Sequence, residues 1–193
     1  MNAFRFSLIV VVVAGTLPLR AADTNGLAAG SQPGQSSPAA ATGAADDKAI
    51  DLAMDKFEST LKAGDYSYMF EVMYTPILDA GGGKEKAMVL AKTIGTTMKE
   101  HQVVVVSWKA AKPYHYIAGN SRTYVVIPYT QMMTMAGKTL KETGCQFGIK
   151  TADAGWQFVN GASLSAAILE QFFPDFPTTV NIPPMQRNQV PGL

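Results

Sequence analysis

The sequence predicts an α+β domain in which three N-terminal helices pack on a strongly curved antiparallel sheet, followed by a short C-terminal helix and a proline-rich tail. Apolar residues recur at helical spacing over residues 47–100. From residue 102 the pattern changes to β-branched runs that are separated by glycine-containing turns. Each connection between these runs is too short for a crossover, so the strands are expected to form an antiparallel meander.

Three helices are expected before the strands. Asp47 is placed as the N-cap of the first helix, and Gly64 falls where a left-handed helix end is expected. Asp65 caps a second, short helix, which ends before Pro76 because the residue before a proline disfavours helical geometry. A third helix covers residues 84–100. Short helices can follow a curved sheet more closely than one straight rod, and the wedge left between helices and sheet is the expected pocket.

Three turns divide the strands, at residues 119–121, 136–137 and 153–155. The meander that they define completes the main domain, which we assign to residues 47–161. Residues 162–193 follow as a short amphipathic helix and an extended, proline-rich tail.

The first 46 residues precede this domain. Residues 1–22 combine a cationic start, an apolar run and a pair of small residues, which is the pattern of a secretory signal peptide. The apolar run is shorter than the ~20 residues of a membrane-spanning helix, although an uncleaved anchor is the alternative. Residues 23–46 consist mainly of Ala, Gly, Ser, Pro and Gln, so we expect a flexible linker. The sequence therefore predicts an exported protein, periplasmic or secreted, with no stable membrane span.

Composition argues against several kinds of partner and site. The chain has 16 Lys and Arg against 15 Asp and Glu, without the concentrated basic surface that nucleic acid or an anionic membrane requires. One cysteine and two distant histidines predict no internal disulfide, no metal site and no cofactor. Cys145 alternates with Phe147 and Ile149 along an apparent strand, so we expect it to be a small buried side chain.

The order of elements resembles the nuclear-transport-factor-2-like superfamily, also called SnoaL-like or the cone fold. The resemblance covers residues 47–161 and is carried by "FESTLKAGDYSYMFEVMYTP", "GGGKEKAMVLAKTI", the strand pair around residues 135–137 and "GIKTADAGWQFVNG". In many members a helix ends in a Gly-Asp pair before a second short helix leads to the pocket wall, and Gly64-Asp65 matches that feature. The resemblance implies a cone-like sheet with a cavity beneath the helices.

The same resemblance implies no single activity, because the superfamily includes isomerases, dehydratases, cyclases and many non-enzymatic binding or dimerisation domains. Its catalytic members use an Asp base or an Asp–His pair that faces the cavity. No such pair falls on matching positions here. Asp79 and Asp153 lie in apparent turns, where solvent contact is expected.

Candidate site residues follow from the expected cavity. His115 is the candidate catalytic base, since an imidazole titrates near neutrality; its alternative role is that of a surface residue, with Tyr114 and Tyr116 facing the opposite side of the strand. Candidate ligand-binding residues are side chains suited to an apolar wall or an amphipathic mouth, and for the methionines the alternative is simple core filling. They are Tyr66, Met69, Met73, Tyr74, Tyr116, Tyr124 and Glu142.

Three functions remain open from the sequence. We expect a non-catalytic domain that binds a small apolar ligand or a protein partner, as a homodimer formed through the outer face of its sheet. One alternative is a lyase or isomerase that uses His115 or a buried carboxylate in the cone cavity. The other is a structural or accessory module, in which "LEQFFPDF" docks on a partner and its three phenylalanines (Phe172, Phe173 and Phe176) are exposed together.

Overall fold

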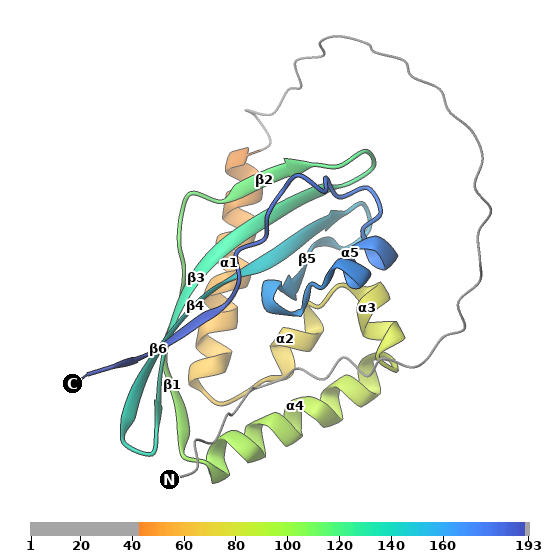
Figure 1. Ribbon diagram of the computed structural model, residues 1–193. Helices are drawn as coiled ribbons and strands as arrows, with labels where there is room; N and C mark the ends of the chain where they lie inside the picture. Colours follow the sequence, from red (N-terminus) through yellow and green to blue (C-terminus); the bar gives the residue numbers. More distant parts are fainter. Residues whose placement is uncertain (1–42, 192–193) are drawn as a thin grey trace.

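The computed structural model describes residues 43–191, and Figure 1 shows how its elements are arranged. The predicted signal peptide and most of the predicted linker lie outside the described residues. The helices are α1 (Gly43–Lys62), α2 (Ser67–Glu71), α3 (Thr75–Ala80), α4 (Gly83–Glu100), η1 (Gly161–Ser163, a 3₁₀ turn) and α5 (Ala166–Phe172). The strands are β1 (Val103–Ala110), β2 (His115–Ala118), β3 (Thr123–Met135), β4 (Lys138–Thr151), β5 (Gly155–Asn160) and β6 (Gln186–Val190). Across residues 43–191 we find no helix with the length and apolar character needed to cross a membrane.

A long hairpin of β3 and β4 forms the centre of the strongly curved antiparallel sheet, as expected from the sequence. The predicted turn at residues 136–137 joins the two strands, and both of its residues have positive φ. β1 and β2 pair with opposite ends of β3, whereas β5 and β6 pair with opposite ends of β4. Each end of the hairpin therefore has its own pair of outer strands.

A first core fills the space between the helices and the inner face of the sheet. The apolar stripe of α1 is buried there, with Ile50, Met54, Phe57 and Leu61 all less than 9% exposed. The Phe57 and Trp108 rings lie 5.0 Å apart, and Trp108 stacks on Tyr129 at 5.1 Å. These large rings occupy the wedge where the sequence suggested a hollow, so the space under α1 is packed rather than empty.

The predicted break between the first two helices is confirmed. Gly64 has φ +73°, and the N–H groups of Gly64 and Asp65 donate to the carbonyls of Leu61 and Thr60, which closes α1 in a Schellman arrangement. The Asp65 carboxylate then accepts a hydrogen bond from the Ser67 N–H at 2.9 Å, at the start of α2. The chain thus ends one helix and begins the next within five residues.

Two helix boundaries differ from the prediction. α1 begins at Gly43, so Asp47 lies inside the helix, where its carboxylate accepts a hydrogen bond from the Tyr116 hydroxyl. Pro76 lies in the first turn of α3 instead of ending a helix, because a proline in the first turn has no N–H to leave unpaired. The predicted third helix, residues 84–100, corresponds to α4.

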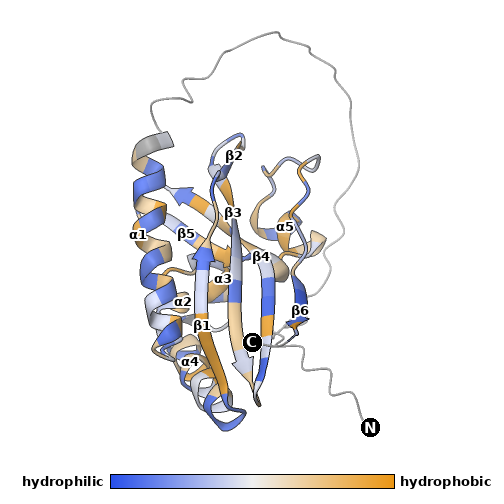
Figure 2. Ribbon diagram, turned by 90° about the vertical axis from the view of Figure 1, so that its left-hand side faces the viewer, coloured by the Kyte–Doolittle hydropathy of each residue, from blue (hydrophilic) through white to orange (hydrophobic). Residues whose placement is uncertain are grey.

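A second core covers the outer face of the sheet, where the sequence suggested only a short helix and a free tail. Figure 2 shows α1 on one side of the strands and α5 on the other. Tyr124 and Phe147 on the sheet pack against Phe173 and Phe176, which are 1% and 7% exposed, and Phe172 is half-buried beside them. The joint exposure of the three phenylalanines, which the alternative of a structural or accessory module required, is therefore not found. They dock on the chain's own sheet.

The burial of Cys145, predicted from strand alternation, is confirmed. Cys145, Phe147 and Ile149 all belong to the second core. The tail does not simply extend from this core, because residues 186–190 add β6 to the sheet. A homodimer that used the outer face of the sheet would therefore have to avoid the part that the C-terminal segment covers.

Candidate functional site

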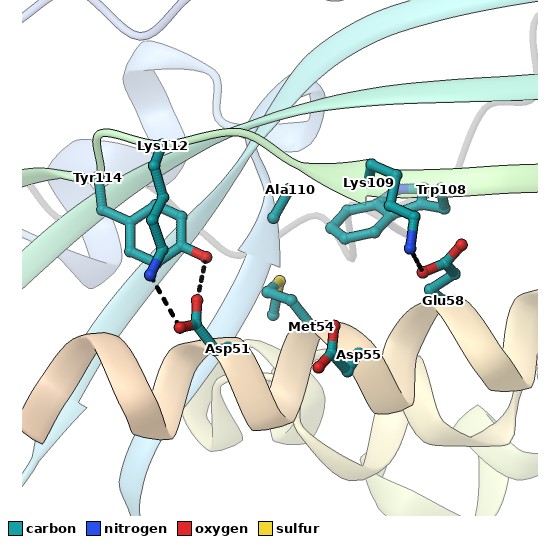
Figure 3. Close-up of a pocket in the computed structure, with 9 residues that line it drawn as sticks. All are labelled: Asp51, Met54, Asp55, Glu58, Trp108, Lys109, Ala110, Lys112 and Tyr114. Atoms are coloured by element: carbon teal, nitrogen blue, oxygen red, sulfur yellow. Dashed lines mark hydrogen bonds and ion pairs between the residues drawn. The ribbon is translucent and has the colours of Figure 1, made fainter.

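A surface groove of about 310 Å³ runs between α1 and the end of β1. Figure 3 shows its walls, with one row of side chains from the helix and the other from β1 and the loop that leads to β2. The lining residues are Asp51, Met54, Asp55, Glu58, Trp108, Lys109, Ala110, Lys112 and Tyr114.

The helical wall is acidic because of residue spacing. Asp47, Asp51, Asp55 and Glu58 follow one another at intervals of four, four and three, which places their carboxylates along one face of α1. The next face of the helix carries the apolar stripe of the first core. The acidic row therefore lies at the border between core and solvent, opposite two lysines and two tyrosines of the β1–β2 region.

Asp51 closes one end of the groove. Its carboxylate accepts hydrogen bonds from Lys112 Nζ at 2.8 Å and from the Tyr114 hydroxyl at 2.7 Å. Slight burial opposes the charge of Asp51, but these two donors outweigh it and hold the pKa of the carboxyl below its usual value. Burial, and then the hydrogen bond to Asp51, raises the pKa of Tyr114 well above that of a free phenol. Tyr114 thus remains a neutral donor.

Glu58 and Lys109 close the other end, with 2.6 Å between Lys109 Nζ and Glu58 Oε2. The hydrogen bond to Glu58, and Asp55 nearby, raise the pKa of Lys109. The Lys109 side chain is 69% exposed, so this ion pair orients the lysine and adds little to stability.

Asp55 lies between these two ion pairs and is exposed (Figure 3). It forms no hydrogen bond or ion pair with any described residue. The apolar residues that line the groove are Met54, Trp108 and Ala110, and Met54 and Trp108 are themselves only 3% and 2% exposed. Three carboxylates against two ammonium groups leave one negative charge in excess, and Asp55 carries it.

His115 lies apart from this groove. Tyr114 and Tyr116 both donate hydrogen bonds to carboxylates of α1, whereas Ile117 packs against the second core. Because side chains alternate along a strand, His115 shares the face of Ile117, and its side chain is exposed. The structure therefore brings no carboxylate of the α1 row to His115.

The seven candidate ligand-binding residues are not gathered at one place. Tyr66, Met69 and Met73 pack in or against the first core, while Tyr74 and Tyr124 belong to the second, across the sheet. Tyr116 stands at the edge, bonded to Asp47, and Glu142 is buried beside Tyr129 and Arg187. None of the seven lines the groove. The residues expected to surround one cavity are instead divided between the two cores and the periphery of the sheet.

Sequence reasoning missed the acidic row, although its signal was present. Carboxylates at helical spacing beside an apolar stripe are usually a solvated surface, and nothing local distinguishes this row from such a surface. Lys109 and Lys112 could not be assigned to the site because their partners lie 51 and 61 residues away in the chain.

A second depression, of about 440 Å³, is shallow and polar. It lies between the β2–β3 and β4–β5 turns, and its two cations are already engaged: Arg122 donates to the Phe172 carbonyl and Lys150 to the Asp46 carboxylate. Among residues 43–191, no group of three or more His, Cys, Asp or Glu side chains is arranged to hold a metal ion.

No protein-family model, curated protein or solved structure matches the chain. The resemblance to the nuclear-transport-factor-2-like superfamily therefore stays a prediction from the sequence. The curved antiparallel sheet with helices on its inner face is the part of that prediction which the structure shows.

Proposed function

We propose that the protein is an exported, non-catalytic binding domain that holds a small, largely apolar ligand with one cationic group in the groove between α1 and β1. The observation that carries the proposal is Asp55, an unpaired carboxylate in a groove that Met54, Trp108 and Ala110 also line. A cone fold of the nuclear-transport-factor-2-like kind would accord with this function, because that superfamily includes many binding domains.

The groove limits the size and the charge of the ligand that it can bind. Its volume of about 310 Å³ is at the small end of ligand sites, so it fits a ligand with one ring or a short alkyl chain. Lys109 and Lys112 are held by Glu58 and Asp51, which leaves Asp55 as the carboxylate for an incoming cation. An exposed ion pair contributes at most about 1 kcal/mol, and Met54 and Trp108 expose little surface for apolar contact, so affinity should be weak.

Two ring-matched compounds of opposite charge test the proposal. Tryptamine and indole-3-propionate share the indole ring, and ligand-observed NMR titration measures the affinity of each for the full chain. Tryptamine should bind and indole-3-propionate should not. Asp55→Asn should weaken tryptamine binding roughly fivefold, which corresponds to a loss of about 1 kcal/mol in binding free energy.

Asp79→Asn is the control, since Asp79 is an exposed acid on α3 outside the groove and its loss changes the net charge equally. Tryptamine affinity should be unchanged in this variant. Equal binding of the two compounds, no binding of either, or equal loss in both variants would contradict the proposal.

The lyase or isomerase alternative has one contact in its favour. Glu142 is buried and accepts a hydrogen bond from the Tyr129 hydroxyl at 3.1 Å, which is the pairing of acid and phenol that such an enzyme would need. Arg187 is bonded to the same carboxylate, however, and neither depression includes Glu142. We therefore do not adopt this alternative.

A further inference from the structure

β6 is held to the sheet by its backbone and by one side chain. It pairs with β4 in antiparallel register, from Thr139 opposite Val190 to Thr143 opposite Gln186. Gln186, Asn188 and Gln189 are exposed, whereas the Arg187 side chain is 29% exposed and Val190, at the end of the strand, is partly covered. A strand with so little apolar burial depends on its ladder of hydrogen bonds and on whatever anchors Arg187.

Arg187 meets a carboxylate that the core already positions. Glu142 is 5% exposed, and its Oε1 accepts from the Tyr129 hydroxyl, whose ring is stacked on Trp108. Arg187 donates to Oε2 from Nε at 3.0 Å and from Nη2 at 2.5 Å. A buried acid is costly without a cation, so this edge of β4 selects a strand with arginine at this register.

The connection to β6 allows the strand to leave while the second core stays anchored. Ile182 packs on the second core, and the Pro183 carbonyl accepts a weak hydrogen bond from Cys145 Sγ at 3.7 Å. Pro184 and Met185 alone separate this anchor from the strand, and Met185 is 39% exposed. Release of β6 therefore requires a hinge at these two residues.

We propose that the edge of β4 is a strand-acceptor site and that residues 186–190 of a second copy of this chain can occupy it, which gives a strand-exchanged dimer. The chain's own C-terminal strand is the occupant because it supplies both the register and the arginine. Exchanged and internal strands make the same contacts, so the balance depends on concentration. A short tether gives an effective concentration in the millimolar range, so exchange should be populated when the protein itself is near that range.

Cysteine pairing across the register tests the exchange. Lys141 lies opposite Asn188, both side chains are exposed, and directly opposed residues suit a disulfide. Full-length Lys141→Cys and Asn188→Cys are purified separately, mixed at about 1 mM total and oxidised. Intact mass spectrometry should then find a mixed disulfide dimer. Native Cys145 is buried and its pKa is raised to about 11, so it does not compete.

The control replaces Asn188→Cys with Gln189→Cys, which moves the thiol to the other face of the strand. Its yield of mixed dimer should be several-fold lower, and adding Arg187→Ala to the Asn188→Cys chain should also lower the yield. A single chain with both cysteines should close an internal disulfide. Equal yields of mixed dimer from the Asn188→Cys and Gln189→Cys chains would overturn the proposed strand exchange, and so would the absence of mixed dimer while the internal disulfide closes. If the internal disulfide does not close, the pairing of β4 with β6 is itself overturned.

Discussion

Asp175 ties three segments together through one carboxylate. It lies in the C-terminal segment, and it accepts hydrogen bonds from the Tyr124 hydroxyl on β3 and from Ser121 in the β2–β3 turn, N–H at 3.2 Å and Oγ at 3.0 Å. Partial burial opposes the charge, but the Tyr124 and Ser121 donors outweigh it and hold the pKa of Asp175 below its usual value. The carboxylate is therefore a stabilising contact of the folded state.

Replacing Asp175 by Asn should lower the free energy of unfolding by about 1–2 kcal/mol at neutral pH. A depressed carboxyl pKa stabilises the fold fully above the ordinary value of about 3.9, and this contribution disappears as pH falls through the lower folded-state value. The gap between wild type and Asp175→Asn should thus close in acid. Urea unfolding at pH 7 and near pH 3 measures it. A gap that is constant with pH would contradict the assignment.

Individual buried residues were predictable only where the local pattern sufficed. Alternation along one strand was enough to place Cys145. Asp46 is 8% exposed and pairs with Lys150, 104 residues away, and an acid in the first turns of a helix otherwise predicts solvent exposure. Its burial depends on the position of β4 over α1, which no local pattern contains.

Among the helices and strands, the end of α1 depends on the backbone conformation of one glycine. Gly64→Ala should cost about 1–2 kcal/mol, because Gly64 is left-handed and an alanine there is strained, although nothing lies within 4 Å of the added methyl group. Gly64→Asn should cost less, since asparagine tolerates that conformation. Thermal unfolding of both variants gives the comparison. Equal losses would mean that backbone conformation is not what closes the helix.

Neighbouring phenylalanines test the docking of α5. Phe173 is 1% exposed and lies within 5.4 Å, between ring centroids, of both Tyr74 and Phe147, so Phe173→Ala should cost about 3–5 kcal/mol. Phe172→Ala removes the same group from a half-buried position and should cost less than half as much. Chemical denaturation of the two variants measures the difference. Similar small losses would show that the segment is not docked in solution.

The sequence did not predict α3 or β6, and the reasons are physical. α3 begins at Thr75 with Pro76 in its first turn. Proline is found both after the end of a helix and in its first turn, so Pro76 alone does not show whether a helix ends or begins there. β6 has the sequence QRNQV, which lacks the apolar alternation of a strand because both of its faces are largely exposed. Pairing with β4, rather than side-chain burial, makes it a strand.

Over the whole molecule, the sheet is shared by two cores that carry separate natural probes. Both tryptophans, Trp108 and Trp156, belong to or pack against the first core, and the single cysteine lies in the second. Because β3 and β5 contribute side chains to both cores, we expect neither core to be lost alone. Tryptophan fluorescence and Cys145 thiol exposure should report coincident unfolding transitions in urea. Separated transitions would show that the C-terminal cover opens independently.

At this scale the α+β class, the curved antiparallel sheet and its hairpin turns were predictable, because periodicity and turn residues encode them. A hollow interior was not. Whether a curved sheet leaves space depends on the volumes of the side chains that face it, and Phe57, Trp108 and Tyr129 meet in the middle of this one. The groove formed instead at the rim, where charged side chains replace apolar ones.

The β3–β4 hairpin also separates the two ends of the described chain. At the start of α1, Asp46 pairs with Lys150 of β4. Val190 pairs with Thr139, which lies eleven residues from Lys150 at the other end of β4. At about 3.4 Å per strand residue, that distance is roughly 35–40 Å. If residues preceding α1 were fixed to a surface, the C-terminal strand would point outward from it, placed to meet a neighbouring molecule.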